Sequence, residues 1–290
     1  MNEAQEQSPH QWGPDACRAA VSVTFDNLGE AADLERANWP EDEPLGRHFS
    51  VRYALPRIMG ILEELGLWST FYVEGLNAEL YPEALLEIAD SGHELGYHGW
   101  RHEYWPNLSL SDETRLLERG VHRMQEIGVG PKGFRPPGGR LSPYSPKLLQ
   151  DLGFTHCSPA GHGTGFLDGL VVLPFAWRVL DAYHYLPRFG GLRETFEGSD
   201  APLSPARFRD TLGSALRGIV RDGGHLTLVF HPFLEEQEDR FEIMRGALEE
   251  LRVLVEERTV WCAPHRDVAS WVRKHPGDFG DGLGLDPTEA

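Results

Sequence analysis

The sequence predicts an α/β fold, either a (β/α) barrel or an open α/β sheet. Two observations predict it: short apolar runs alternate with longer stretches of helical periodicity, and polar clusters follow directly after several of these runs. Alternation of strands and helices gives parallel strands joined by right-handed crossovers. The length of 290 residues fits one large domain of this class, since such barrels commonly hold about 250 residues.

The first predicted strand, residues 21–25, is an apolar run between polar segments. Residues 28–48 are rich in charge, Pro and Gly, so we expect a long loop after it. Residues 51–67 have apolar side chains at helical spacing and predict the first helix. Another helix is expected over residues 111–127, with Glu113 near its start in a capping arrangement.

The remaining elements follow the same alternation. Further strands are expected at 69–73, 95–97, 133–135, 155–157, 225–230 and 260–262, and further helices at 82–91, 145–152, 205–220, 241–255 and 265–274. The Gly-rich stretch 161–196 is expected to be irregular, with one apolar run at 170–173. The tail from Pro276 is acidic and rich in Pro and Gly, so it is expected to be disordered.

Charge and cysteine content exclude several classes of partner. The chain has 27 basic and 45 acidic residues, a formal net charge of −18, which argues against a nucleic-acid or anionic-membrane partner because both need a basic face. No apolar run is long enough to span a bilayer or to act as a secretory signal. The three cysteines are widely spaced and fit no disulfide or zinc framework, so we expect a cytoplasmic protein.

The most informative motif is His98-Gly99-Trp100-Arg101-His102, directly after a predicted strand. Two imidazoles four residues apart can lie on one face of a turn and chelate one divalent metal. Taken alone, histidines at this spacing are more often ordinary surface residues.

Four other polar segments change that balance, because each lies at or just after the end of a predicted strand or apolar run. They are Thr24-Phe25-Asp26-Asn27, the Arg-Pro-Pro-Gly-Gly segment 135–139, Asp181 with Trp177 before it, and His231-Pro232. In an α/β barrel the carboxyl ends of the strands meet at one rim, where functional groups gather. We therefore expect these segments to form one site.

These residue types suit metal-assisted hydrolysis of an amide. Asp26 can accept a proton from water, and Arg135 can orient its carboxylate. Gly138 and Gly139 can bring backbone amides close to an oxyanion, and His231 can protonate the leaving nitrogen. Each has a structural alternative: a cap at Asp26, a rigid turn at 135–139, or a structural histidine at a strand end.

On these motifs the chain resembles the polysaccharide deacetylase family over about residues 19–273, with residues 1–18 and 276–290 as flexible ends. The resemblance implies a distorted (β/α) barrel and a divalent metal, most often Zn, with Co, Mn or Ni as alternatives. It implies that Asp26 is the catalytic base and His231 the catalytic histidine. It implies that Asp181 tunes His231 and that the metal ligands are His98, His102 and the residue at position 27.

Position 27 departs from the family pattern. Typical members carry a second aspartate there, and an allantoinase-like branch carries it one residue later, whereas this chain has Asn27 and Leu28. A neutral amide is a weaker partner for a dication. The outcome is a weakened site, a metal held by another ligand such as Glu30, or no metal. We expect a retained, weakened site because both histidines persist.

Aromatic side chains near the motifs suggest a compact pocket. Trp100 and Trp177 are the expected substrate contacts, together with Gly138 and Gly139, although Trp100, Tyr104, Trp105 and Trp177 can equally be core residues. The long 28–48 loop is similar to that of the allantoinase-like and peptidoglycan-deacetylase-like branch of the family.

Three functions follow from the sequence. The leading hypothesis is a deacetylase-like amidohydrolase of carbohydrate metabolism that acts on a small N-acyl substrate, an N-acyl sugar included. The second is ring opening of a cyclic imide or ureide. The third is a relative without metal that only binds its ligand. The oligomeric state is left open, a homo-oligomer included.

Overall fold

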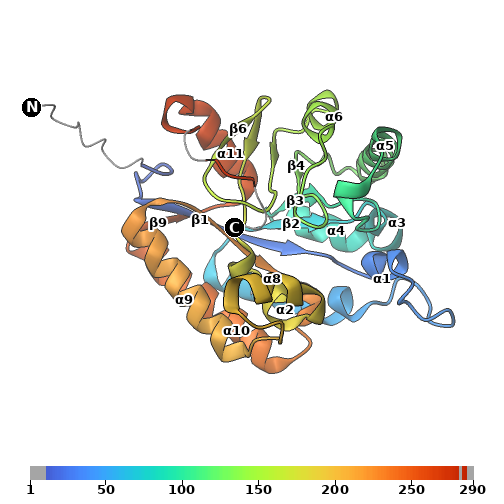
Figure 1. Cartoon of the computed structure of the whole chain (residues 1–290), viewed down its shortest axis with the longest axis horizontal. Coiled ribbons are helices and arrows are strands. Elements are labelled where there is room, and N and C mark those ends of the chain that lie inside the picture. The colour runs from blue at the N-terminus through green and yellow to red at the C-terminus, as the bar shows by residue number, and fades with distance from the viewer. Residues whose placement is uncertain (1–10, 281–282, 286–290) are drawn as a thin grey trace, which may run out of the picture.

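The computed structural model describes residues 11–280 and 283–285. Over these residues one strongly curled nine-stranded sheet forms the centre of the fold (Figure 1). Its strands are β1 (Ala19–Asp26), β2 (Thr70–Val73), β3 (Glu94–Tyr97), β4 (Gly133–Phe134), β5 (His156–Cys157), β6 (Gly165–Leu167), β7 (Leu170–Val172), β8 (Gly224–Phe230) and β9 (Val260–Cys262). Their order is β6-β7-β5-β4-β3-β2-β1-β8, with β9 also beside β1.

The register confirms the predicted parallel arrangement. Every strand pair is parallel except β6 with β7. An isolated parallel bridge between Leu180 and Val229 brings the chain after β7 alongside β8. The sheet therefore curls into a distorted barrel, and the carboxyl ends of β1, β3, β4 and β8 open toward one mouth.

The helices pack around this sheet. They are α1 (Ala31–Glu35), α2 (Leu55–Leu65), α3 (Asn77–Leu80), α4 (Pro82–Asp90), α5 (Leu110–Glu126), α6 (Ser145–Asp151), α7 (Asp181–Tyr185), α8 (Gly190–Glu197), α9 (Pro205–Asp222), α10 (Glu238–Glu256) and α11 (His265–Lys274). Helices α9 and α10 lie side by side along one flank (Figure 1). No helix in the described part of the chain is long and apolar enough to cross a membrane.

The helices form where the apolar spacing predicts them, because the apolar side chains at that spacing are buried in the core. In α2 the residues Leu55, Ile58, Ile61 and Leu62 are buried, and β1 is buried along its whole length. Such a helix buries one apolar stripe, while a central parallel strand is covered on both faces.

Three local expectations differ from the structure. The predicted loop 28–48 contains α1, and the stretch 161–196 contains β6, β7, α7 and α8. Helix α5 begins at Leu110, because the Ser109 side chain caps it by accepting from the Asp112 amide.

The described parts of both chain ends pack against the domain. Trp12 is only 1% exposed and contacts Phe279, while His162 forms a β-bridge with Gly284. The expected flexible ends therefore do not hold for these residues, and residues 1–10, 281–282 and 286–290 lie outside the described part. Cys17, Cys157 and Cys262 are free thiols, as their spacing predicts.

Candidate active site

A cavity of about 640 Å³ lies at the carboxyl ends of the strands. Its wall includes Asp26 at the end of β1, His98 after β3, Arg135 after β4 and His231 after β8. The parallel register places these strand ends at one rim, so residues more than 200 positions apart in sequence meet there. The predicted residues that line the cavity are Asp26, His98, His102, Arg135, Gly138, Gly139, Trp177 and His231.

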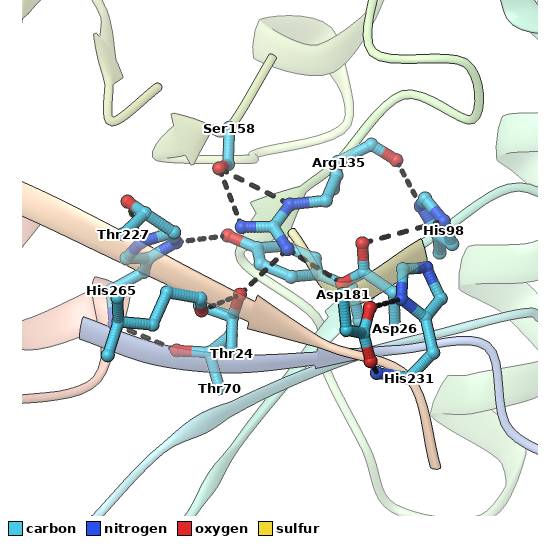
Figure 2. Close-up of polar contacts among 12 residues, drawn as sticks. Thr24, Asp26, Thr70, His98, Arg135, Ser158, Asp181, Thr227, His231 and His265 are labelled. Carbon is cyan, nitrogen blue, oxygen red and sulfur yellow. Dashed lines mark hydrogen bonds and ion pairs between the residues drawn. The ribbon is translucent and has the colours of Figure 1, made fainter. Parts of the chain in front are cut away.

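Arg135 lies at the centre of a buried polar network (Figure 2). Its Nη1 donates to Asp26 Oδ1 at 2.7 Å and to Thr24 Oγ1 at 2.8 Å, while its Nη2 donates to Ser158 Oγ at 2.9 Å. The Tyr72 ring lies 4.4 Å from the guanidinium carbon. These contacts fix the orientation of the guanidinium. It therefore holds Asp26 through Oδ1, and Asp26 Oδ2 remains available to accept a proton.

His231 is held in the same way by Asp181, which is fully buried. His231 Nδ1 lies 2.5 Å from Asp181 Oδ1, and the His231 backbone amide donates to Oδ2 at 2.6 Å (Figure 2). Since the carboxylate only accepts, Nδ1 carries the proton and Nε2 is the ring nitrogen left for the cavity. Asp181 is therefore the predicted partner of His231, although it does not itself line the cavity.

His98 and His102 lie against each other, with ring centroids 4.8 Å apart. His98 Nδ1 donates to the Arg135 carbonyl at 2.7 Å, and its Nε2 lies 4.0 Å from Asp26 Oδ2. Burial lowers the pKa of His98 to about 4, and burial together with the nearby His98 and Arg36 lowers the pKa of His102. Both rings are thus neutral near pH 7, which is the form that ligates a metal.

The loop between these histidines is held in a strained conformation. His102 has a φ of +70°, which L residues rarely adopt. The Glu103 carboxylate accepts hydrogen bonds from the backbone amides of Trp100 at 2.9 Å and Arg101 at 3.0 Å. Gly99, with a φ of +78°, lies so close to Glu103 Oε2 that a Cβ there would be 3.0 Å from it. Glu103 and Gly99 therefore fix the loop that presents the imidazoles.

Two groups complicate the histidine pair. Asn27 is buried, and neither its Nδ2 nor its Oδ1 has a hydrogen-bond partner in the structure. Arg36 Nη2 donates to His102 Nδ1 at 2.9 Å. Because a guanidinium only donates, His102 Nδ1 accepts this bond and the ring proton lies on Nε2.

The comparisons with known proteins agree with this geometry. The family model described as polysaccharide deacetylase matches residues 15–157, the segment that contains Asp26, His98, His102 and Arg135. Over this segment, which is about half of its length, the chain is similar to the polysaccharide deacetylase family. A solved putative polysaccharide deacetylase from Mycobacterium smegmatis is 29% identical, with a TM-score of 0.79 and coverage of 93% of this chain and 94% of that one.

Two further comparisons are informative. Chitin deacetylase 1 of Saccharomyces cerevisiae is 33% identical over 101 residues, and the match covers 34% of this chain and 34% of the yeast protein. PuuE allantoinase shares the fold, with a TM-score of 0.74 at 17% identity over 94% of this chain and 96% of that one. The chain thus matches about a third of the yeast relative's length.

Three predicted residues, Asn27, Asp181 and Trp100, and the alternative ligand Glu30 do not line the cavity. Trp100 is buried in the core, where the Arg119 guanidinium lies 3.6 Å from its ring centroid, so it is not a wall of this cavity. Glu30 is also excluded as an alternative ligand, because its carboxylate accepts from the Gly46 amide and the Tyr81 hydroxyl.

Gly138 and Gly139 line the cavity, but for a reason that differs from the predicted one. Both have positive φ angles, and an added Cβ would come within 2.6 Å of the Tyr104 ring at Gly138 and 2.8 Å of the Trp177 ring at Gly139. The Gly139 amide already donates to the Pro136 carbonyl at 2.9 Å. Of the two predicted oxyanion donors, only the Gly138 amide therefore stays a proposal.

The sequence analysis missed several residues that line the cavity. They are Glu35, Arg36, Tyr104, Arg140, Phe175, Leu180, Arg188, Phe189 and Leu192 among others. Tyr104 was predicted only as an aromatic residue of the pocket or the core. Most of these residues belong to short loops or helices without periodicity, so no sequence pattern marks them.

Proposed function

We propose that the chain is a metal-assisted hydrolase that cleaves the C–N bond of a small N-acyl compound. One observation carries this proposal: Asp26 and His231 line one cavity, and each is held by its own buried partner, Arg135 and Asp181. A base and an acid that face one space are what hydrolysis of an amide requires.

The residues around His98 fit a divalent cation on one condition. His98 Nε2 and the unpartnered Asn27 amide are free to bind one, but His102 first has to release Arg36. No group of three His, Cys, Asp or Glu side chains suited to a metal occurs in residues 11–280 and 283–285, so the set is two imidazoles and one amide. The family uses a divalent metal. When bound, it would polarise the carbonyl and acidify a water.

The chain's own residues move the protons. Asp26 Oδ2 accepts a proton from the attacking water while Arg135 holds Oδ1. The water oxygen bonds to the carbonyl carbon, and the C–N bond breaks as the departing nitrogen takes the Nε2 proton of a His231 ring that is protonated on both nitrogens at this step. The proton that Asp26 has accepted returns to His231 Nε2 as the products leave. Asp181 offsets the positive charge of the protonated ring. One water is consumed, and the products are a carboxylic acid and an amine.

Ring opening of a cyclic imide or ureide is the second candidate. It uses the same proton transfers, and it is favoured by the compact cavity between the rings of Phe175, Trp177 and Phe189. The products separate the two reactions, since deacylation releases two molecules and ring opening gives one product heavier by one water.

The test is a panel of N-acetyl, N-formyl and cyclic imide compounds, assayed with Zn, Co, Mn or Ni and analysed by mass spectrometry. The proposal expects turnover of at least one compound and its loss in Asp26→Asn and His231→Gln, with His122→Gln as the control because His122 is exposed on α5. Binding of a panel compound without turnover would identify a ligand-binding relative, and full activity in either site variant would refute the assignment.

A further inference from the structure

The cavity wall carries the opposite charge from the rest of the chain. The whole chain has 45 acidic and 27 basic residues, yet the cavity is lined by four arginines and two acids: Arg36, Arg135, Arg140, Arg188, Asp26 and Glu35. The wall is therefore positive, and such a cleft concentrates anions.

Three of these arginines have no carboxylate partner. Arg135 is paired with Asp26. By contrast, the ion pairs among the described residues include none with Arg36, Arg140 or Arg188, at a limit of 4.0 Å. Arg36 donates to His102, and Arg188 lies over the Phe189 ring at 5.4 Å from its centroid. Unpaired guanidiniums in a substrate cavity are available to bind an anion.

Arg36 and Arg188 approach each other on the His102 side of the cavity. Arg36 directly follows α1, and Arg188 lies in the short helical turn Pro187–Phe189. Desolvation at the cavity and the Arg36 charge lower the pKa of Arg188 to about 10, with Asp33 and Asp181 opposing this effect. Two cations that repel each other and have no ion-pair partner are stabilised by a bound anion.

The surroundings of Arg188 suit a carboxylate better than a phosphate. The neighbouring wall residues Phe189 and Leu192 are apolar. Phosphate sites usually add several backbone N–H groups from a glycine-rich loop or helix start, and here the turn begins with Pro187, which has no N–H. A planar guanidinium matches a carboxylate with two parallel hydrogen bonds.

We propose that the substrate of this site carries a carboxylate, bound by Arg188 and Arg36, beside the bond that is cleaved. The inference rests on the proposed function, because it concerns the substrate of the same cavity. It narrows the N-acyl class to compounds such as N-acylamino acids and excludes neutral N-acyl sugars as the preferred substrates.

The first test compares matched substrates. Wild-type enzyme is assayed with N-acetyl-leucine, N-acetyl-leucine methyl ester and N-acetylglucosamine. The proposal expects kcat/KM for the free acid to exceed that for the ester and the sugar by at least about tenfold, the size of one lost charged hydrogen bond. Equal values for the acid and the ester would overturn it.

The second test removes the guanidinium. Arg188→Gln is expected to lower kcat/KM about tenfold more for the acid than for the ester, and Arg188→Lys is expected to give an intermediate difference. Arg178→Gln is the matched control, because Arg178 is exposed, pairs with Glu197 and does not line the cavity. An equal loss for acid and ester in Arg188→Gln would indicate a structural role and contradict the proposal.

A binding measurement separates this inference from the proposed function. Calorimetric titration with 4-methylpentanoate, a carboxylate without an amide, is expected to show binding to the wild type and at least about tenfold weaker binding to Arg188→Gln. Binding without hydrolysis of any panel amide would remove the proposed function and keep the carboxylate site. Hydrolysis of a neutral amide without such binding, or tighter binding of inorganic phosphate, would remove the carboxylate site alone.

Discussion

The two halves of the chain contribute to the active site in different ways. Residues 15–157, which match the family model, supply Asp26, Arg135, His98 and His102. The part from residue 158 onward supplies Asp181 and His231 together with most of the apolar wall. The His231–Asp181 pair is complete within the protein, whereas the histidine pair of the first half has an unpartnered Asn27 and an arginine on His102.

This difference separates proton transfer, which the chain's own residues complete, from metal binding, which needs an added ion. The proton donor of the second half is oriented by a buried carboxylate and needs no further group. In the first half the buried Asn27 side chain has no hydrogen-bond partner, and a buried polar group without a partner is costly. We infer that proton transfer is built into the chain, while metal affinity is adjusted by residues 27 and 36.

The largest expected effect comes from removing the proton-transfer groups. Asp26→Asn and His231→Gln should each lower kcat by about 100-fold or more, the usual contribution of general acid–base catalysis. Steady-state kinetics on a turned-over panel compound measure this, and His122→Gln should stay at the wild-type rate. A loss confined to one of the two variants would mean that only one half takes part in the chemistry.

Asp181→Asn should have the next largest effect. The amide cannot hold the Nδ1 proton as the carboxylate does, so we expect kcat to fall about 10- to 100-fold with little change in KM, as for other residues that orient a functional group. Nitrogen-detected NMR of His231 should show a changed tautomer. Wild-type kcat with an altered KM would contradict the orienting role.

A measurement of metal affinity tests directly whether Asn27 and Arg36 limit metal binding in the first half of the chain. Asn27→Asp puts a charged oxygen at the predicted third ligand position, and Arg36→Gln frees His102, so each should raise Zn affinity about tenfold. Equilibrium dialysis measures the bound metal without an activity assay, and Arg47→Gln serves as the exposed control. Unchanged affinity in both variants would show that neither position limits metal binding.

The smallest expected effect is on the pH dependence of the free energy of unfolding. One buried histidine in each half of the chain contributes to it. Burial lowers the pKa of His93 to about 4 and lowers that of His265. Below about pH 6.5 the unfolded imidazoles take up protons that the folded ones do not, so the free energy of unfolding falls as the pH falls.

For His93 this loss should amount to about 2 kcal/mol between pH 7 and pH 5. Urea denaturation at both pH values measures it. Stability that rises on acidification through this window would contradict the buried neutral state.

The sequence predicted the strand ends of the site well because their signal is local. Asp26, His98, Arg135 and His231 each follow an apolar run, and parallel packing then places them at one rim. Asp181, the partner of His231, was predicted from its polar segment as well as from the family resemblance.

The rest of the site depends on tertiary contacts. The bond from Arg36 to His102 joins residues 66 positions apart, and the approach of Arg188 follows from loop packing that no periodicity records. Trp100 illustrates the converse error: an aromatic residue inside a motif points into the core.

A double-mutant cycle of Asp26→Asn and His231→Gln tests most directly whether the two halves act together. If both groups serve one transition state, the double variant should turn over about as slowly as the slower single variant, since residues that act as a unit are strongly non-additive. Rate losses that multiply independently would contradict the joint mechanism.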